Sequence, residues 1–174
     1  APLSRMAPAA LVRCGSPSAI TVVREYLAGG DPEAKRIAAW LISQIGDSSD
    51  ASQLEANIGN EQDPVKRAYA ENALALLGKE AHRGLLTANL ANRSDEIRGL
   101  AAVAAIDGRR IDLAGNLEKM LDDPILDVRL RAAQALLTLS HPANRIEAVK
   151  VDVYAATTAN PRYSEGSMIV LSDG

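Results

Sequence analysis

Side chains that commonly catalyse reactions or bind metals are few and far apart in this chain. The two histidines, His82 and His141, lie roughly 60 residues apart, with no cysteine or glutamate at the spacing of a metal site. The only cysteine, Cys14, falls on an apolar helix face, which predicts a buried structural thiol rather than a nucleophile. Asp123 and Asp127 lack the glycine and the terminal glutamate of a calcium loop. We therefore expect no catalytic residues, no metal ion and no cofactor, and a protein that is not an enzyme.

Acidic and basic residues instead recur together at a regular interval. Four aspartates lie about 32 residues apart, and a basic residue follows each of them within a few positions. A carboxylate at the start of a helix can accept hydrogen bonds from free backbone N–H groups and can pair with a nearby base. We expect these residues to form a structural ladder along the repeats: Asp31, Lys35, Asp63, Arg67, Asp95, Arg98, Asp127 and Arg129.

The fifth position after each of these basic residues lies beside a predicted apolar stripe. In a helical repeat protein, side chains at such a position line the concave surface. Two of the four residues at this position are polar amides, so it is not simply a core position. Trp40 is the only tryptophan and the candidate for a contact hot spot; packing against the N-terminal half-repeat is an equally weighted alternative. Arginines are expected to form a ridge on the same side. The predicted binding residues are Arg36, Trp40, Asn72, Val103, Arg131 and Gln134.

The residues between these positions follow a helical pattern. Apolar side chains recur with a 3.6-residue period after each basic residue. Asp-Pro pairs at 31–32, 63–64 and 123–124 indicate helix starts, and Gly46, Gly78 and Gly108 indicate helix ends. A weaker helical pattern precedes each of these helices, so every unit of about 32 residues is predicted to be a helical hairpin. Stacked hairpins predict an all-α fold: a right-handed α-α solenoid of one half-repeat and four full repeats.

The segments "DPILDVRLRAAQALLTLS" (123–140) and "DPVKRAYAENALALLG" (63–78) resemble the inner helix of HEAT-like repeats, of the short type named after phycobilisome lyases. The resemblance covers about residues 5–140. It implies an α-solenoid that acts as a binding scaffold, because most members of that family bind other proteins. It implies no particular partner.

A different pattern begins after His141, and we place a domain boundary there, between 1–141 and 142–174. Val149, Val151 and Val153 alternate with polar residues, which is typical of a strand, and residues 168–171 form a second short apolar run. The stretch "NPRYSEGSMIVLSDG" (160–174) is similar to the opening of sialidase-like β-propellers, and this resemblance implies that Arg162 matches a carboxylate-binding arginine. The tail is expected to be the start of a following β-rich domain.

The composition of the chain limits both the kind of core it can build and the classes of ligand it is expected to bind. The chain has 174 residues, 47% of them hydrophobic but only 3% aromatic, so its core must be built from small aliphatic side chains packed closely. The net charge of -3 and the absence of a long apolar run predict binding to neither nucleic acid nor membrane.

Two functions therefore remain in view. The leading expectation is a non-catalytic scaffold that binds a protein partner, or an adjacent domain of the same chain, through its concave face. The alternative is an accessory domain of a larger sialidase-like glycosidase, which would be secreted or periplasmic; otherwise a cytoplasmic location is expected. An unpaired strand edge in the tail would allow oligomers to form through it.

Overall fold

The computed structural model describes residues 2–77 and 80–140, and every regular element within these ranges is a helix. The all-α prediction is therefore confirmed for this part of the chain. The α-helices are α1 (Pro2–Arg13), α2 (Ala19–Ala28), α3 (Pro32–Ile45), α4 (Ala51–Asn60), α5 (Pro64–Leu76), α6 (Arg83–Leu90), α7 (Asp95–Asp107), α8 (Ala114–Lys119) and α9 (Leu126–Ser140). Single 3₁₀ turns lie at Ser48–Asp50, Glu80–His82, Ile111–Leu113 and Met120–Asp122.

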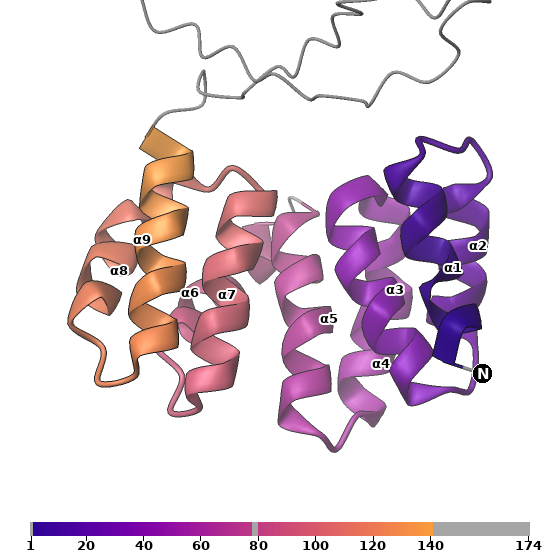
Figure 1. The fold of residues 1–174 in the computed structure, drawn as a ribbon. Helices are drawn as coiled ribbons and strands as arrows, with labels where there is room; N and C mark the ends of the chain where they lie inside the picture. Colours follow the sequence, from indigo (N-terminus) through magenta and orange to yellow (C-terminus); the bar gives the residue numbers. More distant parts are fainter. Residues whose placement is uncertain (1, 78–79, 141–174) are drawn as a thin grey trace, which may run out of the picture. The chain divides into compact units, whose positions relative to one another are not determined.

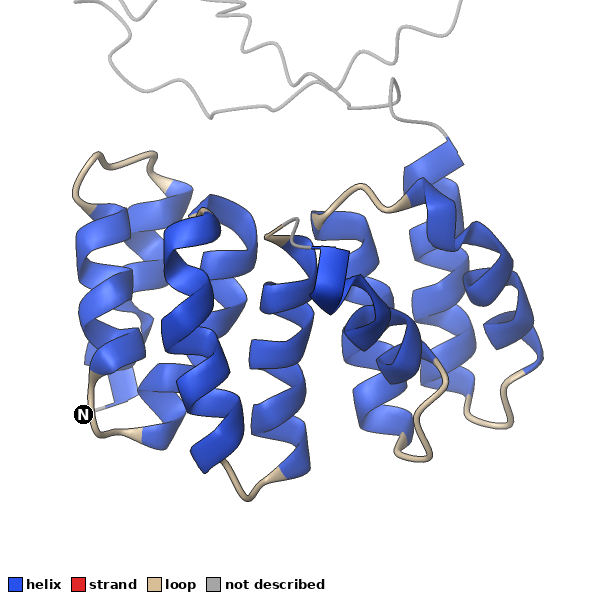
Figure 2. Ribbon diagram, turned by 180° about the vertical axis from the view of Figure 1, so that it is seen from behind, coloured by secondary structure: helices blue, strands red, loops and turns tan. Residues whose placement is uncertain are grey.

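The helices between residues 2 and 140 form two rows. The odd-numbered helices α1, α3, α5, α7 and α9 lie side by side, and we call them the inner row (Figure 1). The even-numbered helices α2, α4, α6 and α8 form the outer row, which is in front in the opposite view (Figure 2). Each inner helix packs against the next inner helix, and α3, α5, α7 and α9 each pack against the outer helix that precedes them in the chain. Because an outer helix runs back between successive inner helices, all inner helices run in the same direction.

The starts of α3, α5, α7 and α9 depend on short polar side chains. The Asp31 carboxylate accepts a hydrogen bond from the Glu33 backbone N–H at 3.0 Å, and Asp63 accepts one from Val65 at 2.9 Å. A proline follows each aspartate in the first turn, where its missing N–H removes no helical hydrogen bond.

The prediction that an aspartate of the ladder caps every inner helix is wrong in the last two repeats. Ser94, rather than Asp95, caps α7, and its hydroxyl accepts a hydrogen bond from the Ile97 backbone N–H. At α9 the carboxylate that accepts a backbone hydrogen bond belongs to Asp123, whereas Asp127 lies within the first turn. The interval of about 32 residues therefore locates the helices correctly but not the cap itself.

Small side chains fill the contacts between inner helices. Ala38, Ala101, Ala132 and Ala135 are fully buried, and so are larger residues that the outer helices contribute, such as Leu54. The buried side chains form two clusters: one extends from α1 to α5, the other from α5 to α9, and α5 contributes alanines to both. Alanine lets helix backbones approach closely, which explains how a chain with few aromatic residues builds a continuous core.

The end of α7 differs from the sequence expectation in detail. Gly108 follows the helix as predicted, but its φ is negative, and the residue in the left-handed region is Arg109, with φ of 50°. A Cβ at Gly108 would lie within clashing distance of the Leu76 side chain of α5. The glycine is therefore needed for close packing on α5 rather than for its backbone conformation.

Several sequence predictions concern residues outside the described ranges. These are Gly78, the predicted strands at 149–154 and 168–171, and Arg162. The chain divides after Ser140 into two units, one residue before the predicted boundary, and all described residues belong to the first. Within the first unit, the expectation for Cys14 is wrong: its side chain is exposed, because it follows the last residue of α1 instead of lying on the buried stripe.

Candidate functional site

A cavity of about 360 Å³ opens among the side chains of the inner row. Helix α5 lies between α3 and α7, and all three helices line the cavity; Met6 of α1 and Arg131 of α9 also contribute. We call this space the inner-row cavity. Its volume falls in the lower part of the range of ligand-binding pockets, which is about 300–1,000 Å³.

The inner-row cavity brings together most of the predicted binding residues. Five of the six line it, and they come from four different helices: Arg36, Trp40, Asn72, Val103 and Arg131. The sixth, Gln134, is exposed on α9 and does not line the cavity. Helix α9 is the last inner helix in the described part of the chain, so no further helix there encloses the space beside Gln134.

Trp40 has features of both alternatives considered for it. Its side chain is half-buried and packs against the buried cluster between α1 and α5. It also lines the inner-row cavity together with Asp107 of α7, and it stabilises the charged form of that carboxylate. Because α5 lies between α3 and α7, this interaction joins two helices that are not neighbours in the row. Trp40 therefore packs along one side and faces the cavity with the other.

Asp107 is a cavity residue that the sequence reasoning missed. Partial removal from water raises the pKa of its carboxyl group above the usual value of 3.8, and the interaction with Trp40 partly opposes this effect. Asp107 is nevertheless an exposed residue, which a ligand can reach from solvent. The equivalent positions in the other repeats are Gln44, Leu76 and Thr138, so an acid occurs here only once. That break in the repeat is the signal that could have identified it.

The cavity arginines each already pair with a carboxylate of their own helix. Arg36 lies 3.0 Å from Glu33 and over the ring of Tyr69 on α5, with its guanidinium carbon 5.1 Å from the ring centroid. Glu33 also contacts Lys66 on α5 at 2.9 Å, and both bases lower the pKa of its carboxyl group, Lys66 the more strongly. These contacts fix the Arg36 guanidinium between α3 and α5.

Arg131 is positioned by a glycine as well as by an acid. Its guanidinium Nε lies 2.7 Å from Asp127, one turn earlier on α9. Its Cδ lies only 3.0 Å from where a Cβ would stand on Gly99. Gly99, in the middle of α7, therefore leaves room for the Arg131 side chain to lie across that helix.

Asn72 differs from the exposed amide expected on a concave surface. It is buried, with 4% of its surface exposed, and its Oδ1 accepts a hydrogen bond of 3.0 Å from Asn89 on α6. The Asn89 amide also donates to Glu71 at 3.1 Å. A buried amide keeps its partner because an unpaired polar group in the core is costly. Asn72 thus joins α5 to the outer row as well as lining the cavity.

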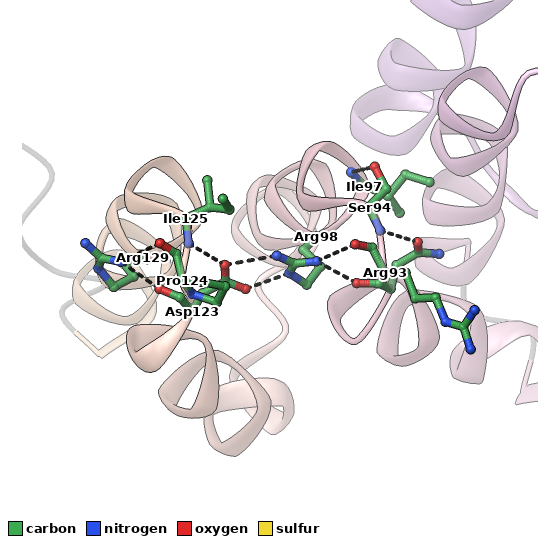
Figure 3. Close-up of polar contacts among 9 residues, drawn as sticks. Arg93, Ser94, Ile97, Arg98, Asp123, Pro124, Ile125 and Arg129 are labelled. Carbon is green, nitrogen blue, oxygen red and sulfur yellow. Dashed lines mark hydrogen bonds and ion pairs between the residues drawn. The ribbon is translucent and has the colours of Figure 1, made fainter.

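In the last two repeats, Arg98 pairs with Asp123, an acid that was not among the predicted ladder residues. The Arg98 guanidinium donates two hydrogen bonds to Asp123, at 2.6 and 2.9 Å, and two more to the backbone carbonyls of Asn92 and Arg93 (Figure 3). Arg129 repeats the second half of this pattern by donating to the carbonyl of Asp123 at 2.7 Å (Figure 3). The Arg98 contact lowers the pKa of the Asp123 carboxyl group. Each arginine therefore stabilises the turn before its own helix, and Arg98 also joins two repeats.

The other ladder residues make local contacts. Arg67 pairs with Glu71 on its own helix at 3.5 Å, and Lys35 lines a smaller cavity of about 190 Å³ near the start of α3. A stronger contact between repeats was missed: Arg24 of α2 donates hydrogen bonds of 2.7 and 3.1 Å to the buried Asp50 before α4. Neither residue belongs to the acidic and basic positions that recur about every 32 residues, so the repeat pattern does not predict this pair.

Residues 2–77 and 80–140 offer neither a metal site nor a membrane-spanning helix. They contain no group of three or more His, Cys, Asp or Glu side chains placed to hold a metal ion. None of the helices between residues 2 and 140 combines the length and the apolar character needed to cross a membrane. No protein-family model, no curated protein and no solved structure matches the chain.

Proposed function

We propose that this chain is a non-catalytic protein-interaction module, built as a right-handed solenoid of HEAT-like repeats, whose inner row binds a segment of a partner protein. The alternation of inner and outer helices at intervals of about 32 residues supports the solenoid architecture. Helical solenoids present their inner helices as one extended surface. The partner is a separate protein or an adjacent domain of the same chain.

The observation that carries the proposal is the composition of the inner-row cavity. Tryptophan, tyrosine and arginine are the residues most enriched among those that dominate the binding energy of protein interfaces. Trp40, Tyr69, Arg36 and Arg131 supply all three types around one cavity, where Leu100 and Val103 add apolar surface. The cavity can therefore receive an apolar side chain of a partner segment while the surrounding helices contact its backbone.

The sialidase-like alternative rests on residues 160–174, which lie outside the described ranges. The helices between residues 2 and 140 support the interaction role on their own, and that role is compatible with a further domain on either side.

A random peptide library displayed on phage tests the proposal directly. Peptides selected on the purified chain are measured against Val103→Trp, which places a large side chain in the cavity, and against Ala88→Trp, which adds the same side chain at an exposed position of the outer helix α6. We expect Val103→Trp to weaken binding roughly tenfold or more, because it fills the space that a peptide side chain occupies. Ala88→Trp should leave the affinity unchanged.

Circular dichroism and thermal melting of both variants show that the helices remain folded in the comparison. The proposal is overturned if selected peptides bind Val103→Trp as tightly as the wild-type chain, or if no peptide is enriched above the level of an unrelated helical protein.

A further inference from the structure

The charges that line the inner-row cavity are not equally available to a ligand. Arg36 and Arg131 are each paired with a carboxylate, at 3.0 and 2.7 Å. Asp107 makes no ion pair within the described part of the chain, and the neutral Trp40 shares the cavity lining with it and stabilises its charged form. The charge that an incoming ligand can neutralise is therefore the negative one.

The position of Asp107 adds to this preference for a cation. It is the last residue of α7, where backbone carbonyl groups without helical partners carry partial negative charge. The inner helices run in the same direction, so the carboxyl-terminal ends of α3 and α5 lie on the same side (Figure 1). Asp107 and these helix ends all favour positive charge at one end of the cavity, whereas Arg36 and Arg131 come from the amino-terminal halves of their helices.

The side chains around Asp107 also suit a long basic side chain. Trp40 lines the cavity with Asp107, and indole rings attract cations over their faces more strongly than other aromatic rings. Val103 lies one turn before Asp107 on α7 and lines the same cavity, as does Leu100. The aliphatic part of a lysine or arginine can pack on such apolar surface while its charged group reaches an acid.

We infer that the Trp40–Asp107 end of the inner-row cavity is a subsite for a lysine or arginine side chain of the partner segment. The inference rests on the proposed function and specifies the chemistry of the ligand. The basic group pairs with the Asp107 carboxylate and lies against the Trp40 indole, and its aliphatic part packs on Leu100 and Val103. A segment that carries an acidic residue at this place meets repulsion from Asp107.

Three capped pentapeptides with the sequence Ala-Leu-X-Leu-Ala, in which X is arginine, glutamine or glutamate, test the inference. Trp40 is the only tryptophan, so its fluorescence reports binding at the subsite itself. We expect the arginine peptide to bind roughly fivefold or more tightly than the glutamine peptide, and the glutamate peptide to bind most weakly. In Asp107→Asn, which keeps the size of the side chain, this ranking should disappear. In Glu118→Gln, which removes an exposed acid from the outer helix α8, it should persist.

The outcomes separate this inference from the proposed function. Equal binding of the three peptides, or a preference for the glutamate peptide, overturns the basic subsite and leaves the interaction role intact. A ranking that survives in Asp107→Asn also overturns it. If none of the three peptides changes the Trp40 fluorescence while the library peptides depend on Val103, the subsite fails alone. If neither set binds, both fail together.

Discussion

The carboxyl group of Asp107 and the indole of Trp40 show how much a single residue can depend on packing between non-neighbouring helices. Asp107 is next to Trp40 only because the alanine-rich α5 keeps α3 and α7 close together. Removal from water raises the pKa of the carboxyl group, and the indole N–H stabilises its charged form and so limits the shift. The charged carboxylate is therefore less favourable in the folded chain than in the unfolded one.

This shift predicts a pH-dependent effect of Asp107→Asn. The folded pKa lies above the unfolded value of 3.8, so the ionised carboxylate lowers stability at pH values above the folded pKa. As the pH falls through the folded pKa, the folded state takes up the proton first, and the unfavourable contribution disappears. We expect Asp107→Asn to be the more stable form at neutral pH and to lose this advantage toward pH 3.8, as measured by thermal melting across the range.

Asp112 provides a control because the pKa of its carboxyl group shifts in the opposite direction. Arg110 lowers the pKa of its carboxyl group, so Asp112→Asn should reduce stability at neutral pH, and the loss should fade as the pH falls through the lowered folded pKa. Parallel pH profiles for the two variants would contradict the assigned environments.

Gly99 offers a second prediction at the scale of single residues. Glycine inside a helix is about 1 kcal/mol less favourable than alanine. A Cβ at Gly99 would press on the Cδ of Arg131, but 39% of that arginine side chain is exposed, so it can move aside. We expect Gly99→Ala to raise the free energy of unfolding by about 0.5 kcal/mol, less than the full helix gain. Urea denaturation measures the change.

The double variant Gly99→Ala/Arg131→Ala tests whether the Arg131 side chain is what crowds a Cβ at position 99. Without the arginine side chain, the Gly99→Ala substitution should give the larger gain of about 1 kcal/mol. If Gly99→Ala fails to raise the free energy of unfolding even when Arg131 is alanine, something other than the Arg131 side chain limits the space at Gly99.

The sequence allowed some site residues to be predicted and not others, for reasons specific to each. Trp40, Val103 and Arg131 could be found because they occupy related positions in a repeat whose inner face is shared. Asp107 could not, because only one repeat has an acid there and its significance depends on contact with a residue two helices away. Asn72 has the predicted position, but its burial depends on the Asn89 amide, which the repeat pattern does not specify.

At the scale of helices, the contacts between inner helices depend on alanine at a few positions. Ala101 on α7 and Ala132 on α9 are completely buried. We expect Ala101→Leu or Ala132→Leu to lower the free energy of unfolding by about 1–3 kcal/mol, because the added atoms force neighbouring helices apart. Ala88→Leu, at an exposed position of α6, is the matched control and should have little effect. An unchanged melting temperature in Ala101→Leu would contradict the packing described for α7.

The helix starts and ends were predictable to different degrees. Asp-Pro pairs identify the starts of α3 and α5 because both the cap and the proline act locally. Helix α7 begins at Asp95 as expected, but its cap is the adjacent Ser94, and both residue types can cap a helix. The outer helix α8 has only six residues between two 3₁₀ turns, too few for a clear period, and packing rather than local pattern determines its bounds.

At the scale of the described unit, residues 2–140, the two buried clusters predict local rather than uniform unfolding. Leu54 of α4 belongs to the first cluster and Leu117 of α8 to the second, and both are fully buried. Truncating either leucine to alanine should lower stability by about 2–5 kcal/mol within its own cluster. Because most contacts join adjacent helices, the distant cluster should be affected less.

Amide hydrogen exchange distinguishes local unfolding of one cluster from uniform unfolding of residues 2–140. Leu54→Ala should speed exchange chiefly in α2 to α4, and Leu117→Ala chiefly in α7 to α9, with α5 responding to both. Equal acceleration across all helices in both variants would mean that the described unit unfolds as one cooperative block.

The whole inner row is proposed to be the binding surface, and amide chemical-shift mapping tests that claim most directly. The isotope-labelled chain is titrated with the peptides selected from the random library, and the shifted amides are assigned to helices. We predict that the largest changes cluster in α3, α5 and α7 around Trp40, Asn72 and Val103. Changes concentrated in the outer helices α2, α4, α6 and α8, with the inner row unaffected, would contradict the assignment of the binding surface.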